Sequence, residues 1–192
     1  MTKFSLREIP AFGGFSQRVD GASLTEETGM AIIAVTIRTG HHNTFKAAFE
    51  KLFGAAYPSA QQSVIAGKTM IVPSAIDQVF IIEKTDPRAL EERLINALGK
   101  HATTTDQTDG WGVLTLAGPK TITTMERVSQ VDMDISVFPV GAVARTVLEH
   151  VGAIVVRQKA KRGEDHRFML MSQRSSAASF LHSITGTTPF AY

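Results

Sequence analysis

The segment from Asp106 to Pro119 constrains the fold most, because it places a strand between two turn signals. Asp109-Gly110 is a dipeptide typical of turns. Residues 111–117 then alternate around Val and Leu, as a half-buried strand does. Gly118-Pro119 ends this strand, and proline suits the first position of a helix that we expect to run to about Val128. Trp111 begins the strand, where it could be buried on the face of Val113, Thr115 and Ala117 or could be an exposed contact.

Strand and helix signals alternate along the rest of the chain. Strands are expected at 30–37, 64–72 (a hairpin around Gly67-Lys68), 78–83, 142–148, 153–157 and 168–171. Helices are expected after Asn43 as cap, after Asp86-Pro87, and from Ser175 to about Ile184 with a serine as cap. Neighbouring strand pairs favour mixed or antiparallel sheets over a doubly wound parallel sheet. The order of strand, helix, strands and helix occurs twice, which predicts a pseudo-duplicated α+β fold with packed helices.

The expected domain organisation is one domain preceded by an arm. Residues 1–28 lack clear periodicity and contain four Pro or Gly residues, so we expect an extended N-terminal arm that Phe4, Phe12 and Phe15 could anchor. Residues 29–192 are then a single α+β domain of two similar halves, about 29–100 and 101–192. A length of 192 residues is compatible with this organisation.

Composition excludes several classes of function. The absence of cysteine excludes disulfides, thiol catalysis and thiolate metal sites. A net charge of +2 does not indicate nucleic-acid binding. No apolar run approaches the roughly 20 residues needed to span a bilayer, and the first 15 residues have no continuous apolar core. We therefore expect no nucleic acid, no membrane and a cytoplasmic location.

The sequence lacks the motifs of a cofactor or metal site. No Gly-x-Gly-x-x-Gly or Gly-x-x-x-x-Gly-Lys-[Ser/Thr] pattern is present to hold a dinucleotide or a phosphate chain. The six histidines, including the adjacent His41 and His42, have no metal-ligand spacing. We expect no catalytic, cofactor-binding or metal-binding residues on this chain.

The strand expected at 142–148 has a mixed face, on which Arg145 and Glu149 alternate with Val143 and Val147. Such a face, with His150 at its edge, could contact another protein. An internal Arg145–Glu149 pair on the domain's own surface is the alternative. A direct Glu149–His150 pair is disfavoured, because adjacent strand residues point to opposite faces.

Two other polar groups have a structural and a functional interpretation. Arg174 with the amides at Ser175-Ser176 could hold an anion, or a serine could simply cap the helix. A basic cluster is expected on a hairpin loop, as solvated residues or as a surface for an acidic partner; it contains Arg157, Lys159, Lys161, Arg162 and Arg167.

Three separated motifs carry a resemblance to a known family. They are Asp109-Gly110-Trp111 with Ala117-Gly118-Pro119, the segment Phe138–Thr146 (FPVGAVART), and Arg174–Ala177 (RSSA) followed by Phe180–His182 (FLH). In these motifs the chain resembles the gamma subunit of heterotetrameric sarcosine oxidase. Proteins of that family look like the folate-binding domain of the aminomethyltransferase of the glycine cleavage system.

The resemblance implies an accessory, non-catalytic gamma subunit that supports assembly with alpha, beta and delta subunits. The complex would oxidise sarcosine to glycine, with FAD, FMN, NAD and tetrahydrofolate on the partner subunits. Folate-using relatives carry an acidic pair in the strand that matches 67–72 and a Gly-Tyr-Thr-Gly-Glu type segment near 147–152, and this chain has neither. Folate chemistry on this chain is therefore not expected.

Three alternatives to this function stay open. The chain could be the equivalent subunit of another N-methyl amino-acid dehydrogenase, such as one for N-methylglutamate. It could be a free-standing folate-dependent one-carbon enzyme, or an isolated module that binds an acidic partner. The missing carboxylates disfavour the enzyme.

Overall fold

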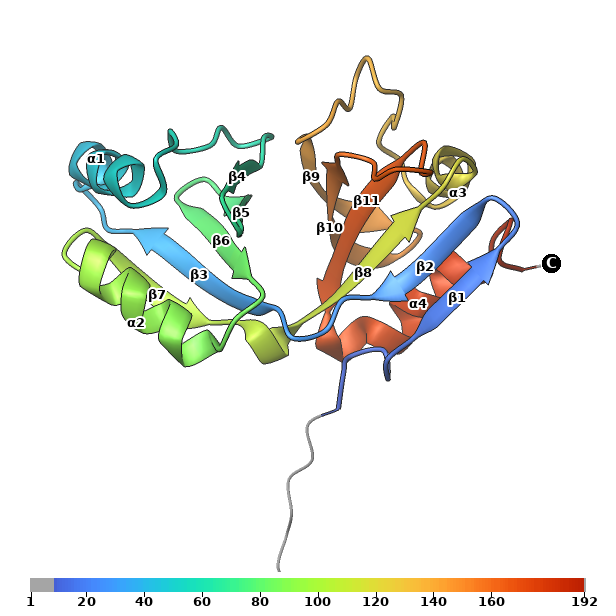
Figure 1. The fold of residues 1–192 in the computed structure, drawn as a ribbon, viewed down its shortest axis with the longest axis horizontal. Coiled ribbons are helices and arrows are strands. Elements are labelled where there is room, and N and C mark those ends of the chain that lie inside the picture. The colour runs from blue at the N-terminus through green and yellow to red at the C-terminus, as the bar shows by residue number, and fades with distance from the viewer. Residues whose placement is uncertain (1–8, 192) are drawn as a thin grey trace, which may run out of the picture.

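The computed structural model describes residues 9–191, which form two β-sheets packed against each other with helices on their outer sides (Figure 1). The first sheet has the order β4-β5-β6-β3-β7 and contains β3 (Ala31–Ile37), β4 (Val64–Ala66), β5 (Thr69–Ala75), β6 (Gln78–Glu83) and β7 (Ala102–Asp106). The second has the order β1-β2-β8-β11-β10-β9 and contains β1 (Ser16–Val19), β2 (Ala22–Glu26), β8 (Trp111–Ala117), β9 (Val143–Leu148), β10 (Val151–Gln158) and β11 (Arg167–Gln173). The helices are α1 (His42–Phe53), α2 (Pro87–Leu98), α3 (Thr121–Val128) and α4 (Ala177–Thr185), with short 3-10 turns η1 (Thr108–Gly110) and η2 (Arg174–Ser176).

The two halves share one topology. The series β3-α1-β4-β5-β6-α2 has the same order of elements as β8-α3-β9-β10-β11-α4. In each half the first strand pairs with the last strand of the following meander, which gives the spatial orders β4-β5-β6-β3 and β9-β10-β11-β8. Every pairing is antiparallel. The prediction of a pseudo-duplicated, antiparallel α+β fold is confirmed.

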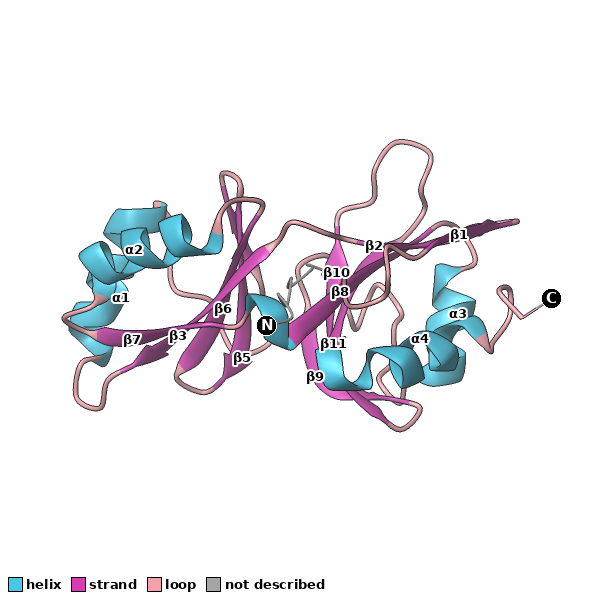
Figure 2. Cartoon of the chain, turned by 90° about the horizontal axis from the view of Figure 1, so that it is seen from below, coloured by secondary structure: helices cyan, strands magenta, loops and turns pink. Residues whose placement is uncertain are grey.

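Each sheet buries both of its faces. In β3, Ile33 and Val35 pack beneath α1 and α2, whereas Ile32 and Ala34 pack against the second sheet. β10 follows the same rule, since Val155 faces the helix side and Val156 faces the first sheet. Strands buried on both faces read as almost continuous apolar runs, which is how these two appear in the sequence. Figure 2 shows the result, with α1 and α2 at one end of the molecule and α3 and α4 at the other.

The expected N-terminal arm is wrong for the part that the structure describes. Residues 16–26 form the β1–β2 hairpin, and β2 pairs with β8, so that Leu24 lies opposite Leu116 in the core. β1 is the outermost strand and its residues are at least partly exposed, so its polar sequence carries little periodicity. The expected boundary at residue 100 also shifts, because β7 pairs with β3 in the first sheet. The part of the arm before residue 9 lies outside the described residues.

Two expected caps are also wrong. Asn43 lies within α1, which begins at His42 without a side-chain cap. The serines before α4 accept no capping hydrogen bond, because η2 runs directly into α4 and the Ala177 amide donates to the Arg174 carbonyl. Asp86 does cap α2, and its carboxylate accepts from the Ala89 amide at 3.0 Å.

Trp111 lies between its two expectations. It is half-buried, and its ring lies edge-on to Phe80 with 5.2 Å between the centroids. This contact joins the start of β8 to β6 and so helps to hold the two sheets together.

Candidate functional site

A cleft of about 420 Å³ lies between the two halves. Both halves supply its apolar lining, which consists of Met30, Ile65, Met70, Val113, Val140, Val156 and Met169. The backbone holds the halves together at its edge, where Gln62 bridges Ala142 and the Ser63 amide donates to the Gly141 carbonyl at 2.7 Å. The cleft therefore exists only because distant segments of the chain meet.

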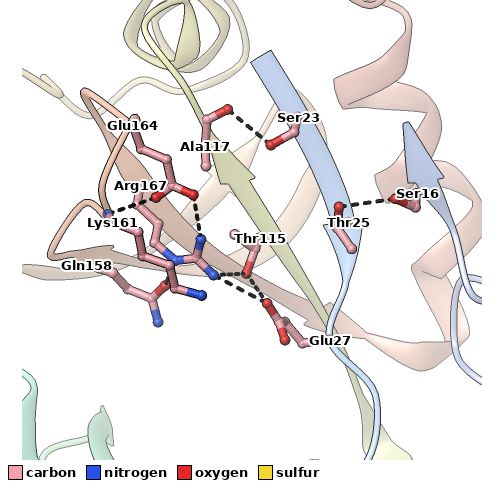
Figure 3. Close-up of polar contacts among 10 residues, drawn as sticks. All are labelled: Ser16, Ser23, Thr25, Glu27, Thr115, Ala117, Gln158, Lys161, Glu164 and Arg167. Carbon is pink, nitrogen blue, oxygen red and sulfur yellow. Dashed lines mark hydrogen bonds and ion pairs between the residues drawn. The ribbon is translucent and has the colours of Figure 1, made fainter. Parts of the chain in front are cut away.

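One wall of the cleft is a polar network centred on Arg167 (Figure 3). The guanidinium donates to Gln158 Oε1 and to Glu164 Oε1, both at 3.0 Å, and its Nη2 lies 3.4 Å from Glu27 Oε1. The Thr115 hydroxyl donates to the same Glu27 oxygen at 2.7 Å. These contacts join β11 and β8 to the connection between β2 and β3. The carboxylates of Glu27 and Glu164 balance the charge of Arg167.

The predicted basic cluster is not one unit. Arg167 is paired, as described above, and Arg157 is buried with 2% of its surface exposed. Lys159, Lys161 and Arg162 remain exposed on the β10–β11 loop. Among residues 9–191 no carboxylate lies within 4.0 Å of these three cations. Only Lys159 and Lys161 of the three line the cleft.

Arg157 fixes the long connection between α3 and β9. Its Nη1 donates to the Met133 carbonyl at 2.7 Å and to the Phe138 carbonyl at 3.0 Å, and its Nη2 lies 2.9 Å from His166 Nδ1. The guanidinium carbon stands 5.2 Å from the centre of the Phe168 ring. Burial lowers the pKa of Arg157, and the nearby Asp134 carboxylate opposes that effect. The expectation of a solvated arginine was wrong because Arg157 lies on the core-facing side of β10, beneath the connection that supplies the Met133 and Phe138 carbonyls.

The predicted interface residues do not share one face. Arg145 lies in β9 and is exposed, but its Nη1 donates to the Ser74 carbonyl of β5 at 2.7 Å. Glu149 lies beyond the strand, in a turn with a positive φ of 51°. That turn brings Glu149 Oε2 to 3.8 Å from His150 Nδ1, and no ion pair joins Glu149 to Arg145 in the described part of the chain. The mixed face therefore ends at Val147.

A second buried charge lies at the end of β6. Glu83 is 2% exposed and accepts hydrogen bonds from Lys68 and Arg93, both at 2.7 Å, and from the Thr69 hydroxyl at 2.8 Å. Burial by itself would raise the pKa of Glu83, but the hydrogen bonds from its three partners outweigh burial and lower the pKa. The hydrogen bonds to Glu83 therefore connect the β4–β5 hairpin to β6 and α2.

Two of the histidine contacts and the contact of Arg174 join segments that are far apart in the sequence. His42 Nε2 lies 2.8 Å from Asp77 Oδ1, and the Nδ1 atoms of His41 and His101 are 3.2 Å apart. Within residues 9–191 no three acidic or histidine side chains are grouped so that they could hold a metal ion. Arg174 donates to the Ile9 carbonyl.

A second cleft, of about 940 Å³, has an acidic lining. Three of its five carboxylates are engaged by backbone amides: Glu26 accepts from Phe12 and Gly14, Asp86 caps α2, and Asp106 accepts from Thr108. These groups shape turns and hold the segment before β1 in place.

Sequence reasoning assigned Arg157 to a basic surface cluster and did not single out Glu83, although a signal for the burial of both was present. Strand alternation places Arg157 on the face of Ala153 and Val155, and Glu83 on the face of Val79 and Ile81. A charged side chain on such a face needs partners, which both residues have.

Similarity to solved structures extends over most of the chain. A heterotetrameric sarcosine oxidase from Corynebacterium sp. U-96, in complex with pyrrole 2-carboxylate, contains a chain that matches with a TM-score of 0.75 and 19% identity, over 89% of this chain and 86% of that one. The glycine cleavage system aminomethyltransferase T from Bartonella henselae matches with a TM-score of 0.59 and 14% identity, over 88% of this chain and 46% of that one. At these identities the two likenesses show a shared fold.

In the described part of the chain, no helix combines the length and the apolar character that crossing a membrane requires.

Sequence comparison identifies the family. No curated protein matches the chain significantly. The model of the sarcosine oxidase gamma subunit family matches residues 39–187. The chain belongs to the sarcosine oxidase gamma subunit family.

Proposed function

We propose that this chain is an accessory, non-catalytic subunit that supports the assembly of a heterotetrameric sarcosine oxidase. The observation that carries the proposal is the match of residues 39–187 to the gamma subunit family, together with a fold shared with a chain of a heterotetrameric sarcosine oxidase. Its partners are the alpha, beta and delta subunits, and the complex works in the cytoplasm.

The contacts of the ionisable side chains support a structural role. Glu27 is held by Thr115 and Arg167, and Glu83 by Lys68 and Arg93. A general base needs a free lone pair within reach of a substrate. Both oxygens of Glu83 and one oxygen of Glu27 already accept hydrogen bonds from the chain's own side chains. FAD, FMN, NAD and tetrahydrofolate are bound by the partner subunits in this proposal.

The free side of β9 is one contact surface in this proposal. β9 is the last strand of its sheet, and edge strands present unpaired backbone groups. Other segments cover the two ends of this edge, where Val143 donates to Gln61 and Leu148 bridges Ser129, so the proposed contact is the part between them. It exposes Arg145 and Val147, and the following turn exposes Glu149 and His150. An arginine beside an apolar side chain is a common combination in interfaces.

The test is assembly with the other chains of the complex. The wild-type chain is expected to co-elute with them in size-exclusion chromatography, and alone it is expected to show no sarcosine oxidation. Arg145→Ala should weaken assembly, whereas Arg88→Ala, on the exposed side of α2, should not. Since Arg145 also bonds to Ser74, the melting temperature of each free variant is measured in parallel. A wild-type chain that fails to associate, or that oxidises sarcosine alone, contradicts the proposal.

A further inference from the structure

The cleft between the halves has an apolar interior and an apolar mouth. Met30, Met70 and Met169 lie along it, and methionine adapts well to a variety of partner shapes. At the mouth, Ile65 is 62% exposed and Val140 is 48% exposed. The two come from different halves, and the hydrogen bonds between Ser63 and Gly141 hold them near each other. The apolar surface thus extends from inside the cleft onto the outside of the molecule.

Exposed apolar side chains concentrate on the loop that carries Val140. The connection between α3 and β9 also exposes Ile135 at 56% and Val137 at 62%. In Figure 1 this loop projects from the body of the molecule between α3 and β9. Its base is fixed by the buried Arg157, so the loop presents these side chains on a defined support. Several exposed apolar side chains on one loop are unusual for a free surface and favour a site of interaction.

The charge at the cleft is positive. Arg167 is balanced by Glu27 and Glu164, but Lys159 and Lys161 line the cleft, and their side-chain ammonium groups have no carboxylate within 4.0 Å among residues 9–191. Unpaired cations beside an apolar cleft favour an occupant that carries a carboxylate next to an apolar group. A small molecule of that type would leave Ile65 and Val140 exposed, whereas a polypeptide would cover them.

We propose that this cleft receives a segment of a partner chain that presents apolar side chains beside an acidic residue. The proposal rests on the accessory function above and adds which surface of the chain is used and what chemistry it recognises. The apolar side chains enter between Met30 and Met70, and the acidic residue pairs with Lys159 or Lys161. This surface is separate from the β9 edge residues Arg145 and Val147, which do not line the cleft.

The first test is oxidative footprinting of the wild-type chain, free and in the assembled complex. Met30 and Met70 are half-buried and open to the cleft, so their oxidation rates should fall several-fold on assembly. Met125 and Met133 are fully buried in the core and serve as controls whose rates should not change. Unchanged rates at Met30 and Met70 in a complex that has formed overturn the proposal and leave the accessory function standing.

The second test uses variants with matched controls. Val140→Asp and Lys161→Glu should each weaken association with the partner chains by about tenfold or more, with the effect of Lys161→Glu declining at high salt. Ile95→Asp and Lys100→Glu are the matched controls; both change exposed residues on or after α2 and should bind as wild type.

The outcomes separate the two proposals. Equal binding by all four variants, or equal weakening by the controls, overturns the cleft proposal. Native mass spectrometry of the free chain shows whether a small carboxylate occupies the cleft instead, and such a bound mass also overturns it. Failure of the wild-type chain to associate at all contradicts the accessory function itself.

Discussion

The Ser63 amide and hydroxyl both donate to the carbonyl of Gly141, at 2.7 and 2.8 Å. This contact joins the connection after α1 to the start of β9, and so the first half of the fold to the second. Gly141 has a φ of +90°, and a Cβ there would lie 2.2 Å from the Gln62 amide nitrogen. The glycine in the Phe-Pro-Val-Gly-Ala segment is therefore required by its backbone conformation, whereas the Gln62 side chain could move aside for a Cβ.

Gly141→Ala is expected to lower the free energy of unfolding by about 1–3 kcal/mol, because a side chain is strained at this φ and displaces Gln62. Chemical denaturation measures the change. Gly152→Ala is the control, since a Cβ at Gly152 meets nothing within 4 Å, and its effect should stay within about 0.5 kcal/mol. Equal stability of the two variants would show that the junction adapts to a side chain.

Arg157→Met should release the connection between α3 and β9. The Met133 and Phe138 carbonyls lose their donor in the interior, which costs about 1–3 kcal/mol of stability. Hydrogen exchange should also become faster in residues 129–142. Arg162→Met changes an exposed arginine of the neighbouring loop and should alter neither quantity. Unchanged exchange in Arg157→Met would mean that apolar packing alone fixes the loop.

Glu83 should make the stability of the chain depend on acid. Its folded-state pKa is lower than the ordinary value of 4.5, because hydrogen bonds from Lys68, Thr69 and Arg93 outweigh the effect of burial. The stabilisation is therefore complete above about pH 4.5 and is lost as the pH falls through the folded-state pKa. Glu83→Gln should be less stable at pH 7 and should show a flatter decline of unfolding free energy with acid. Glu92→Gln, on the exposed side of α2, should follow the wild-type curve.

Periodicity predicted most elements of the fold because their strands bury at least one face. The strands β1, β2 and β7 were missed. β2 buries only Ala22 and Leu24, so its alternation is short. β7 (ATTTD) has only Ala102 fully buried, and β1 has no buried residue, so neither shows a clear pattern of apolar side chains. Both are recognised only through their partners, β3 and β2, which lie far away or follow a turn.

The cleft could not be predicted from the sequence. Met30, Ile65, Val140 and Met169 are separated by 29 or more residues along the chain, and only the pairing of the sheets brings them together. Local patterns identify which face of a strand is buried, but they do not show which other segment covers it. Lys159 and Lys161 were recognised as part of a basic cluster. The sequence did not show that these two lysines are exposed while Arg157 is buried and Arg167 is paired, because that depends on where β10 ends and β11 begins.

The isolated chain is expected to bind neither tetrahydrofolate nor a flavin. The β4–β5 hairpin, where the folate-using relatives carry an acidic pair, contains no carboxylate in residues 67–72. The nearest acidic partner of this hairpin, Glu83, is already held by Lys68, Thr69 and Arg93. A pterin would therefore find no free carboxylate there to accept its N–H groups, and an unpaired buried donor costs about 1–3 kcal/mol.

Calorimetric titration of the purified chain with tetrahydrofolate should show no heat of binding, with a glycine cleavage aminomethyltransferase as the positive control. The absorbance spectrum of the same preparation should lack flavin bands. The same titration with Arg93→Ala tests the role of Glu83, because this change removes one hydrogen-bond donor from the Glu83 carboxylate without adding a new acid. If the wild-type chain binds folate in the micromolar range, or carries stoichiometric flavin, the accessory role gives way to a chain with its own cofactor chemistry.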